Sequence, residues 1–152
     1  MKIEPANADD IPQLVDFLKE LFNIELDFTA DASLQQRGLE LLLAEMAAGG
    51  HAVVMVARDP AGQVVGMATA QLVISTSEGA PSAWIEDVVV HRDRRRQGIA
   101  RLLVDAILVW AQERGATRAQ LVMDTANASA ELFYNGLGWD QTHLKVRRHF
   151  IT

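Results

Sequence analysis

One stretch in the middle of the chain constrains the fold more than any other. A β-branched run, Val88-Val89-Val90, is followed after several basic residues by Gly98 and then by an amphipathic segment. The apolar residues of that segment recur at helical spacing up to Gly115, and a short β-type run, residues 118–123, comes next. Strand, helix and strand in this order typically form a parallel βαβ unit. The sequence therefore predicts an α/β fold.

The turn between this strand and this helix has the features of an anion site. Residues 95–100 read Arg-Arg-Gln-Gly-Ile-Ala, and no Ser, Thr or Asn stands just ahead of the helix to cap it. The first N–H groups of a helix lack intrahelical partners, and the helix dipole adds positive charge there. Gly98 leaves the backbone accessible, and Arg95, Arg96 and Arg101 can add charge-assisted contacts. We expect a phosphate-bearing ligand at this turn.

Composition excludes several classes of function. The chain has 152 residues, 49% of them apolar, which suits a single domain spanning residues 1–152. It has no cysteine, which removes thiolate chemistry and fits a reducing compartment. The net charge of −6 disfavours nucleic acid, and no apolar stretch approaches the roughly 18 residues of a membrane span. We expect a cytoplasmic protein that needs no metal and binds neither nucleic acid nor membrane.

Periodicity and turn residues place the remaining elements. Strands are expected at residues 2–5, 52–58, 64–74 and 83–90, and helices from Asp9 or Asp10 to Phe22, at 34–47, at 99–114 and at 127–137. Residues 75–82 are expected to form a loop rich in small side chains. Residues 144–151 alternate basic with mostly apolar side chains, which predicts a last strand and leaves a homodimer contact open there.

A second block gives the anion site a family context. Residues 127–139 contain the pattern Asn-x-x-Ala-x-x-Phe-Tyr and close with Gly138-Trp139. Together with Arg95, Gln97, Gly98 and Ala100, which match Q/R-x-x-G-x-G/A, this block resembles the GNAT superfamily of acetyl-CoA-dependent N-acetyltransferases. The resemblance covers nearly the whole chain, although residues 1–50 match only in the order of elements.

The resemblance implies a mixed α/β fold with a central, mostly antiparallel sheet of six to seven strands, a splayed parallel pair and about four flanking helices. It implies acetyl-CoA as acyl donor, with the pantetheine paired to the backbone of the 83–90 strand. A bulge there would free one N–H to polarise the acetyl carbonyl. The expected cofactor-binding residues are Val88, Val89, Val90, Arg95, Arg96, Gln97, Gly98, Ile99, Ala100, Arg101, Asn127 and Tyr134.

Two side chains are candidates for the proton transfers. Tyr134 lies two helical turns after Asn127, and the resemblance implies that its hydroxyl protonates the CoA thiolate, although a tyrosine packed with its hydroxyl in water is the alternative. Glu86 falls in an apolar strand, where a carboxylate must be paired or functional, and it lies two positions before Val88 on the same face. Asp87 on the opposite face, or a water chain, is the competing base.

Acidic side chains suggest a cationic acceptor. Residues 23–32, 75–82 and 140–143 are expected to form its pocket, with Glu25, Asp27 and Glu86 as binding residues. The predicted activity is direct transfer of acetyl from acetyl-CoA to a primary amine in a ternary complex, the acceptor being a small cationic amine or an amino acid derivative. A non-catalytic acyl-CoA-binding sensor or complex subunit is the alternative. A P-loop enzyme is the weakest reading, since no Lys-Ser or Lys-Thr follows Gly98.

Overall fold

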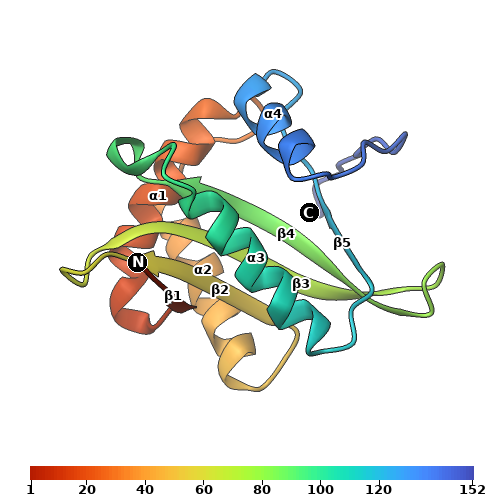
Figure 1. Cartoon of the computed structure of the whole chain (residues 1–152), viewed down its shortest axis with the longest axis horizontal. Helices are drawn as coiled ribbons and strands as arrows, with labels where there is room; N and C mark the ends of the chain where they lie inside the picture. The colour runs from red at the N-terminus through yellow and green to blue at the C-terminus, as the bar shows by residue number, and fades with distance from the viewer. The chain divides into compact units, whose positions relative to one another are not determined.

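The first part of the chain forms one open sheet. A computed structural model describes residues 1–152, which divide into two compact units, Met1–Leu121 and Val122–Thr152. The strands of the first unit are β1 Lys2–Pro5, β2 Ala52–Arg58, β3 Val64–Ser75, β4 Ala80–Val90 and β5 Arg118–Leu121. They lie in the order β1-β2-β3-β4-β5 (Figure 1). The first four pair antiparallel and β4 pairs with β5 in parallel, which confirms the predicted parallel pair.

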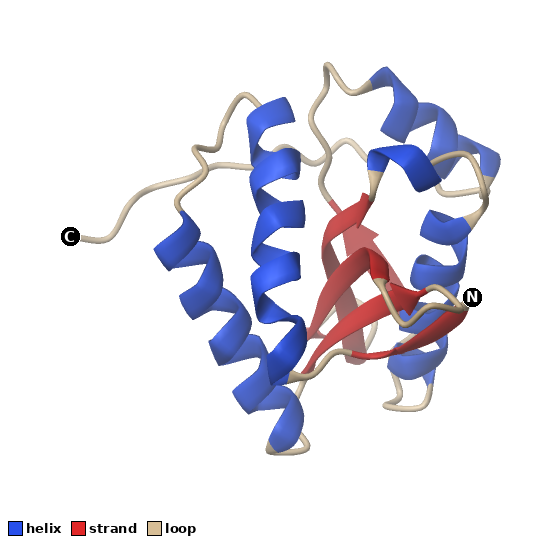
Figure 2. Cartoon of the chain, turned by 90° about the vertical axis from the view of Figure 1, so that its left-hand side faces the viewer, coloured by secondary structure: helices blue, strands red, loops and turns tan.

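Helices cover both faces of this sheet (Figure 2). Helices α1 Ile11–Ile24 and α2 Ala32–Ala47 pack on one face, where Phe17 and Leu39 join Met67 and Val89 in a buried apolar cluster. Helix α3 Ile99–Gln112 packs on the other face with Leu103 fully buried. A Cβ at Gly66 would lie 3.2 Å from Leu103 Cδ1, so glycine lets α3 approach the sheet closely.

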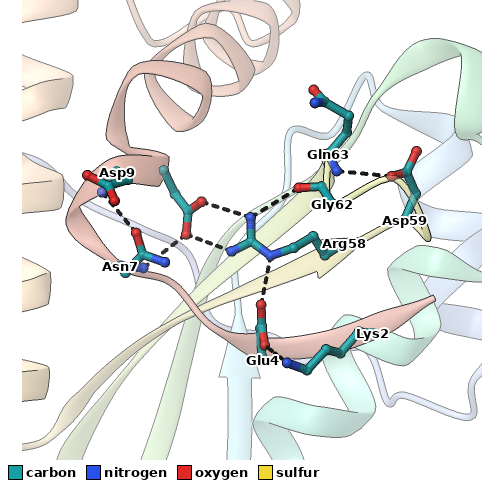
Figure 3. Close-up of polar contacts among 9 residues, drawn as sticks. Lys2, Glu4, Asn7, Asp9, Arg58, Asp59, Gly62 and Gln63 are labelled. Atoms are coloured by element: carbon teal, nitrogen blue, oxygen red, sulfur yellow. Dashed lines mark hydrogen bonds and ion pairs between the residues drawn. The ribbon is translucent and has the colours of Figure 1, made fainter.

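A network of ion pairs ties β1 and the start of α1 to β2 (Figure 3). The Arg58 guanidinium donates to Glu4 Oε1 at 2.7 Å and to both carboxylate oxygens of Asp10 at 3.0 Å. Asp10 also accepts the backbone N–H of Asn7, whose side chain caps the short 3-10 turn Ala8–Asp10. Hydrogen bonds from Lys2 and then from Arg58 hold the pKa of Glu4 below its ordinary value. This network is structural and lies outside the candidate site.

The predicted bounds of several elements are confirmed. Strands 2–5 and 52–58 match, and α3 begins at Ile99 as expected. Helix α2 begins two residues earlier than predicted, because the Asp31 side chain accepts the N–H of Ser33 at 3.0 Å and of Leu34 at 3.2 Å and so caps the helix.

The expectation of six to seven strands is wrong, because the sheet has five strands. The predicted last strand, residues 144–151, is irregular and exposed. Alternating side chains alone do not make a strand, since its N–H and C=O groups need a neighbouring strand as partner. The second unit therefore contains a single regular element, helix α4 Ala128–Gly136.

None of the helices has both the length and the apolar character that crossing a membrane requires. The structure also contains no cluster of three or more His, Asp or Glu side chains arranged to hold a metal ion.

Candidate functional site

Strand β4 has two halves with different neighbours. Residues 82–85 pair with β3 on one side and with β5 on the other, from Ser82 opposite Arg118 to Ile85 opposite Leu121. From Glu86 to Val90 the strand pairs with β3 only. This second half, residues 86–90, therefore presents an open edge, which is the condition that pairing with an extended ligand requires.

The open half contains a β-bulge. Glu86 pairs with Thr69 and Val89 pairs with Met67, so Asp87 and Val88 together oppose one residue of β3. Asp87 has a φ of 55°, a left-handed conformation that is uncommon outside glycine. The bulge interrupts the alternation of faces, so the expectation that Glu86 and Val88 share a face by simple alternation is wrong. The bulge itself, which the family resemblance implied, is present.

The direction of the backbone N–H groups narrows the choice of donor on the open edge. The His91 N–H donates to the Val65 carbonyl at 2.8 Å. In an antiparallel ladder this direction alternates, so Val89 also turns its N–H toward β3 and Val90 turns away from it. The Arg95 Nε donates to the outward Val90 carbonyl at 3.1 Å, which agrees with that assignment. Of the three valines, Val88 and Val90 remain as candidate donors at the open edge.

The turn after β4 ends in an uncapped helix. Gly98 occupies the N-cap of α3 with a φ of 78° and offers no side chain to the helix. The first hydrogen bond of the helix runs from the Leu102 N–H to the Gly98 carbonyl at 3.1 Å. The N–H groups of Ile99, Ala100 and Arg101 precede that bond and have no acceptor within the helix. The sequence-based expectation of free donors at this helix end is confirmed.

The main role of Gly98 is to allow the backbone conformation at the start of α3. A Cβ at this position would meet no protein atom within 4 Å, so crowding by the protein does not require glycine. The left-handed φ favours glycine, since other residues pay about 1–2 kcal/mol for that conformation. The open space beside Gly98 leaves room for a ligand at the helix end.

The arginines in and just after the turn are all exposed but differ in their partners. Arg94 donates to Asp59 Oδ2 at 3.2 Å, and Arg95 holds the Val90 carbonyl, so both fix the turn itself. Arg101 lies 3.6 Å from Asp105 in an exposed pair one helical turn away. Arg96 is exposed and left-handed, with a φ of 64°, next to the exposed Gln97. Arg96 and Arg101 are the cations best placed to meet an anion.

Three carboxyl groups gather around the bulge. Glu86 is exposed, and the Trp84 indole Nε1 donates to its Oε1 at 2.8 Å. Asp87 is partly buried, and its desolvation, followed by the charges of Glu86 and Glu25, raises its pKa to about 6 against the lowering effect of its hydrogen bond from Thr69. Glu25 is the C-cap of α1, and Asp27 follows it in the next turn. The structure thus brings Glu25, Glu86 and Asp87 together.

The expectation for residues 75–82 is wrong. They form the β3–β4 hairpin, with Ser75 in β3 and Ala80 in β4, and only the tip is a turn. Glu78 at this tip lies 3.6 Å from Arg118 and accepts from the Thr117 hydroxyl at 3.1 Å. The tip is about six strand residues from Glu86, roughly 20 Å along β4. This hairpin does not adjoin the carboxyl cluster.

The second unit holds the other predicted residues on α4. Asn127 stands at the N-cap, outside the helix, where its Oδ1 accepts the Ala130 N–H at 3.0 Å. Asn127 therefore caps the helix that carries Tyr134. Trp139 donates its N–H to the Tyr134 carbonyl at 3.1 Å, and Gly138 donates to Asn135 with a φ of 79°, which is a Schellman C-cap.

This cap also packs the tyrosine. The Trp139 ring lies 5.4 Å from the Tyr134 ring, and the Phe133 ring lies 4.9 Å away on the same helix. Burial raises the pKa of Tyr134 to about 12. The hydroxyl therefore carries its proton at neutral pH.

Sequence reasoning missed Thr69. This residue is 3% exposed in the middle of β3, and its hydroxyl contacts both Glu86 and Asp87. A signal was available, because Thr69 is a polar residue in the otherwise apolar run from Val64 to Ala70 and must find a partner when buried. Its partner could not be read from the sequence, since a bulge decides which side chain lies opposite.

Comparisons with known proteins agree with these features. The family model described as "Acetyltransferase (GNAT) family" matches residues 15–139. That match covers most of the chain and contains both sequence blocks described above. The chain belongs to the GNAT acetyltransferase family, and the protein is an acyltransferase.

Individual relatives support this assignment. An aminoglycoside N(6')-acetyltransferase type 1 of Serratia marcescens is 28% identical over 105 residues, which are 67% of this chain and 72% of that protein. N-acetyltransferase family 8 member 2 of Rattus norvegicus is 35% identical over 81 residues, 53% of this chain, and the matched region spans only 36% of the rat protein. The structure of an aminoglycoside antibiotic 6'-N-acetyltransferase from Acinetobacter haemolyticus shares the fold, with a TM-score of 0.81 and 21% identity over 100% of this chain and 99% of that one.

Proposed function

We propose that this protein transfers the acetyl group of acetyl-CoA directly to a primary amine in a ternary complex. The observation that carries the proposal is the continuity of an open strand edge, residues 86–90, with an uncapped helix end at Ile99. Such an edge can pair with the pantetheine amides, and the helix end can hold the pyrophosphate. Bound acetyl-CoA supplies an activated thioester whose carbonyl is the reacting group.

The residues present fit that cofactor. Val88 and Val90 are the candidate N–H donors at the open edge, and Ile99, Ala100 and Arg101 offer N–H groups at the helix end. Arg96 and Arg101 add positive charge beside them, while the backbone at Gln97 and Gly98 leaves the approach open. An N–H aimed at the thioester oxygen would stabilise the charge that develops there during attack.

We propose Glu86 as the group that takes the proton from the amine. Its carboxylate is exposed and is oriented by the hydrogen bond from Trp84. Loss of this proton frees the nitrogen lone pair, which forms the new C–N bond as the C–S bond breaks. A positioned base of this kind contributes about 10²- to 10⁴-fold in rate.

We propose Tyr134 as the group that meets the departing thiolate. Its hydroxyl is protonated at neutral pH, because its pKa is about 12. An ordinary thiol has a pKa near 8.5, so full proton transfer from this tyrosine to a thiolate is uphill. Tyr134 would therefore act chiefly as a hydrogen-bond donor that stabilises the negative sulfur until solvent supplies a proton. Asn127 would support this role by capping α4.

The acceptor is proposed to be a small cationic amine or an amino acid derivative. Glu25, Glu86 and Asp87 concentrate carboxyl groups beside the bulge, with Asp27 close in sequence to Glu25. A cationic amine would be drawn to such a group of charges. One curated relative and one structural neighbour are named as aminoglycoside acetyltransferases, which supports an amine-rich acceptor.

We also propose that the protein is cytoplasmic, consists of one domain and forms a homodimer. The lack of cysteine supports the cytoplasm as the compartment. The family match across residues 15–139 supports one N-acetyltransferase domain over residues 1–152. The exposed alternating segment 144–151 supports a homodimer contact.

A thiol-release assay with a panel of small cationic amines tests the proposed function. Wild-type protein is expected to release CoA only with certain amines, Glu86→Gln to lose about 10²-fold or more in kcat, and Tyr134→Phe about 10-fold or more. Glu113→Gln, at the far end of α3, is the matched control and should keep full activity. Calorimetry with acetyl-CoA should give unchanged affinity for Glu86→Gln. Binding of acetyl-CoA without transfer to any amine would support an acyl-CoA sensor instead.

A further inference from the structure

One buried hydroxyl, that of Thr69, lies beside the bulge and has two oxygen partners. The Thr69 Oγ1 lies 3.2 Å from the Glu86 carbonyl oxygen and 3.1 Å from the Asp87 Oδ2. Thr69 is 3% exposed, so solvent does not compete for its hydrogen bonds. The contacts join β3 to the two residues of β4 at which the strand leaves its regular register.

Counting protons at this hydroxyl gives the two states of the network. A threonine hydroxyl has one hydrogen to donate, so it cannot donate fully to both the Glu86 carbonyl and an ionised Asp87. When Asp87 is protonated, its carboxyl O–H donates to Thr69, and Thr69 donates to the Glu86 carbonyl. The Thr69–Asp87 hydrogen bond persists in both states and only its direction reverses.

The hydrogen bond acts on a strained residue. Asp87 has a φ of 55°, and a conformation of this kind persists only where surrounding contacts hold it. Thr69 supplies such a contact from the neighbouring strand. The orientation of Asp87 in turn decides the direction of the Val88 N–H on one side and the place of Glu86 on the other, because these are its chain neighbours.

We propose that Thr69 and Asp87 are positioning residues for acetyl transfer, whose mutual hydrogen bond holds the bulge and thereby aims the Val88 N–H and the Glu86 carboxylate. The inference rests on the proposed function, in which Glu86 takes the proton of the amine and an N–H of the open edge, assigned here to Val88, stabilises the thioester oxygen. Asp87 is partly buried and bonded to Thr69, whereas Glu86 is exposed. The two adjacent carboxyls therefore have separate roles, and the exposed one meets the amine.

Two matched pairs of variants test this inference. Thr69→Val removes the hydroxyl and keeps the shape, and Thr69→Ser restores the hydroxyl. Asp87→Asn keeps a hydrogen bond, because its amide can donate to Thr69 as the protonated acid does, and Asn tolerates the left-handed conformation. Asp87→Gly keeps that conformation without strain but removes the side chain.

The expected result is a split between kcat and KM. Thr69→Val and Asp87→Gly should lower kcat about 10-fold, the effect of one hydrogen bond. Their KM for acetyl-CoA should stay within about twofold, since the uncapped end of α3 is untouched. Thr69→Ser and Asp87→Asn should stay within about threefold of wild type in kcat. A purely structural role would instead lower the melting temperature and leave kcat of the folded fraction unchanged.

A second readout does not depend on turnover. In ¹H–¹⁵N spectra, addition of acetyl-CoA should shift the Val88 amide similarly in wild type, Thr69→Ser and Asp87→Asn, and differently in Thr69→Val and Asp87→Gly. A kcat loss of 100-fold or more in Asp87→Asn would overturn the inference and make Asp87 the proton acceptor. Wild-type kcat and an unaltered amide shift in Thr69→Val would also overturn it. If wild type acetylates no amine, the proposed function fails, and the amide shifts still decide the inference.

Discussion

The two halves of β4 show how one strand serves both the fold and the site. Residues 82–85 are hydrogen-bonded on both edges, and Ser82, Ala83 and Ile85 are buried. Residues 86–90 are paired on one edge only. They contain the bulge, the exposed Glu86 and Asp87 with its left-handed backbone conformation. Full pairing satisfies the backbone and fixes the sheet, while partial pairing leaves polar backbone groups for a ligand. The site begins where β5 stops pairing with β4.

Hydrogen exchange offers the most direct way to break this comparison. The Pro81 carbonyl accepts the Thr117 N–H, so alternation turns the amides of Ala83 and Ile85 toward β5. These two amides should exchange at least about 10³-fold more slowly than the outward amide of Val90. Addition of acetyl-CoA should slow Val90 and leave Ala83 unchanged. Equal protection of Val90 and Ala83 in the free protein would contradict an open edge.

The partly buried carboxyl of Asp87 in the open half should make stability depend on pH. The pKa of Asp87 is raised from 3.8 to about 6, so between those values the folded protein holds this proton more tightly than the unfolded chain. The contribution of Asp87 to the free energy of unfolding is fully present below about pH 4. It falls by about 3 kcal/mol as the pH rises through about 6. Asp87→Asn does not titrate and should gain on wild type by that amount between pH 4 and pH 8.

Chemical unfolding at several pH values measures this difference. Glu86→Gln is the matched control, because Glu86 is exposed, and its stability should stay within about 0.5 kcal/mol of wild type. A wild-type to Asp87→Asn difference that does not change between pH 4 and pH 8 would show that Asp87 is not buried as described.

Two arginines outside β4, Arg118 in β5 and Arg101 in α3, should separate stability from binding. Arg118 donates to the hydroxyls of Ser75 at 3.1 Å and Ser77 at 3.2 Å, and so ties β5 to the β3–β4 hairpin. Arg118→Met should cost about 1–2 kcal/mol of unfolding free energy and leave acetyl-CoA affinity unchanged. Arg101→Met should cost less than about 0.5 kcal/mol, because its pair with Asp105 is exposed, and should weaken acetyl-CoA binding several-fold. The reverse pattern would refute the division of β4.

Substitutions of two glycines test the comparison of the two halves of β4 and have the smallest expected effect on stability. Gly98 at the helix end and Gly79 at the hairpin tip both have positive φ, 78° and 63°, and a Cβ on either meets nothing within 4 Å. Alanine at each position should therefore cost about 1 kcal/mol of stability. Calorimetry should show that only Gly98→Ala also weakens acetyl-CoA binding. Equal binding by both variants would place the anion elsewhere.

Much of the architecture was predictable from local patterns. The apolar stripe of α3, Pro12 in the first turn of α1 and the Gly138-Trp139 cap of α4 each indicate an element from nearby residues alone. A strict alternating pattern predicts Glu86 and Val88 on one face of the strand, and such a pattern cannot predict the bulge between Glu86 and Val89. The prediction of six to seven strands was wrong in part because residues 144–151 alternate like a strand but pair with no strand of the sheet.

The sequence by itself determined the helix end at Arg95–Ala100 and the tyrosine helix, since caps, turns and periodicity act over a few residues. Tertiary structure alone decided which edge of β4 is open, that Thr69 lies against Asp87, and that Glu25 joins the carboxyl group beside the bulge. These contacts join residues far apart in the chain. Register and burial set them, and both emerge only when the whole sheet is assembled and its backbone hydrogen bonds are shared out.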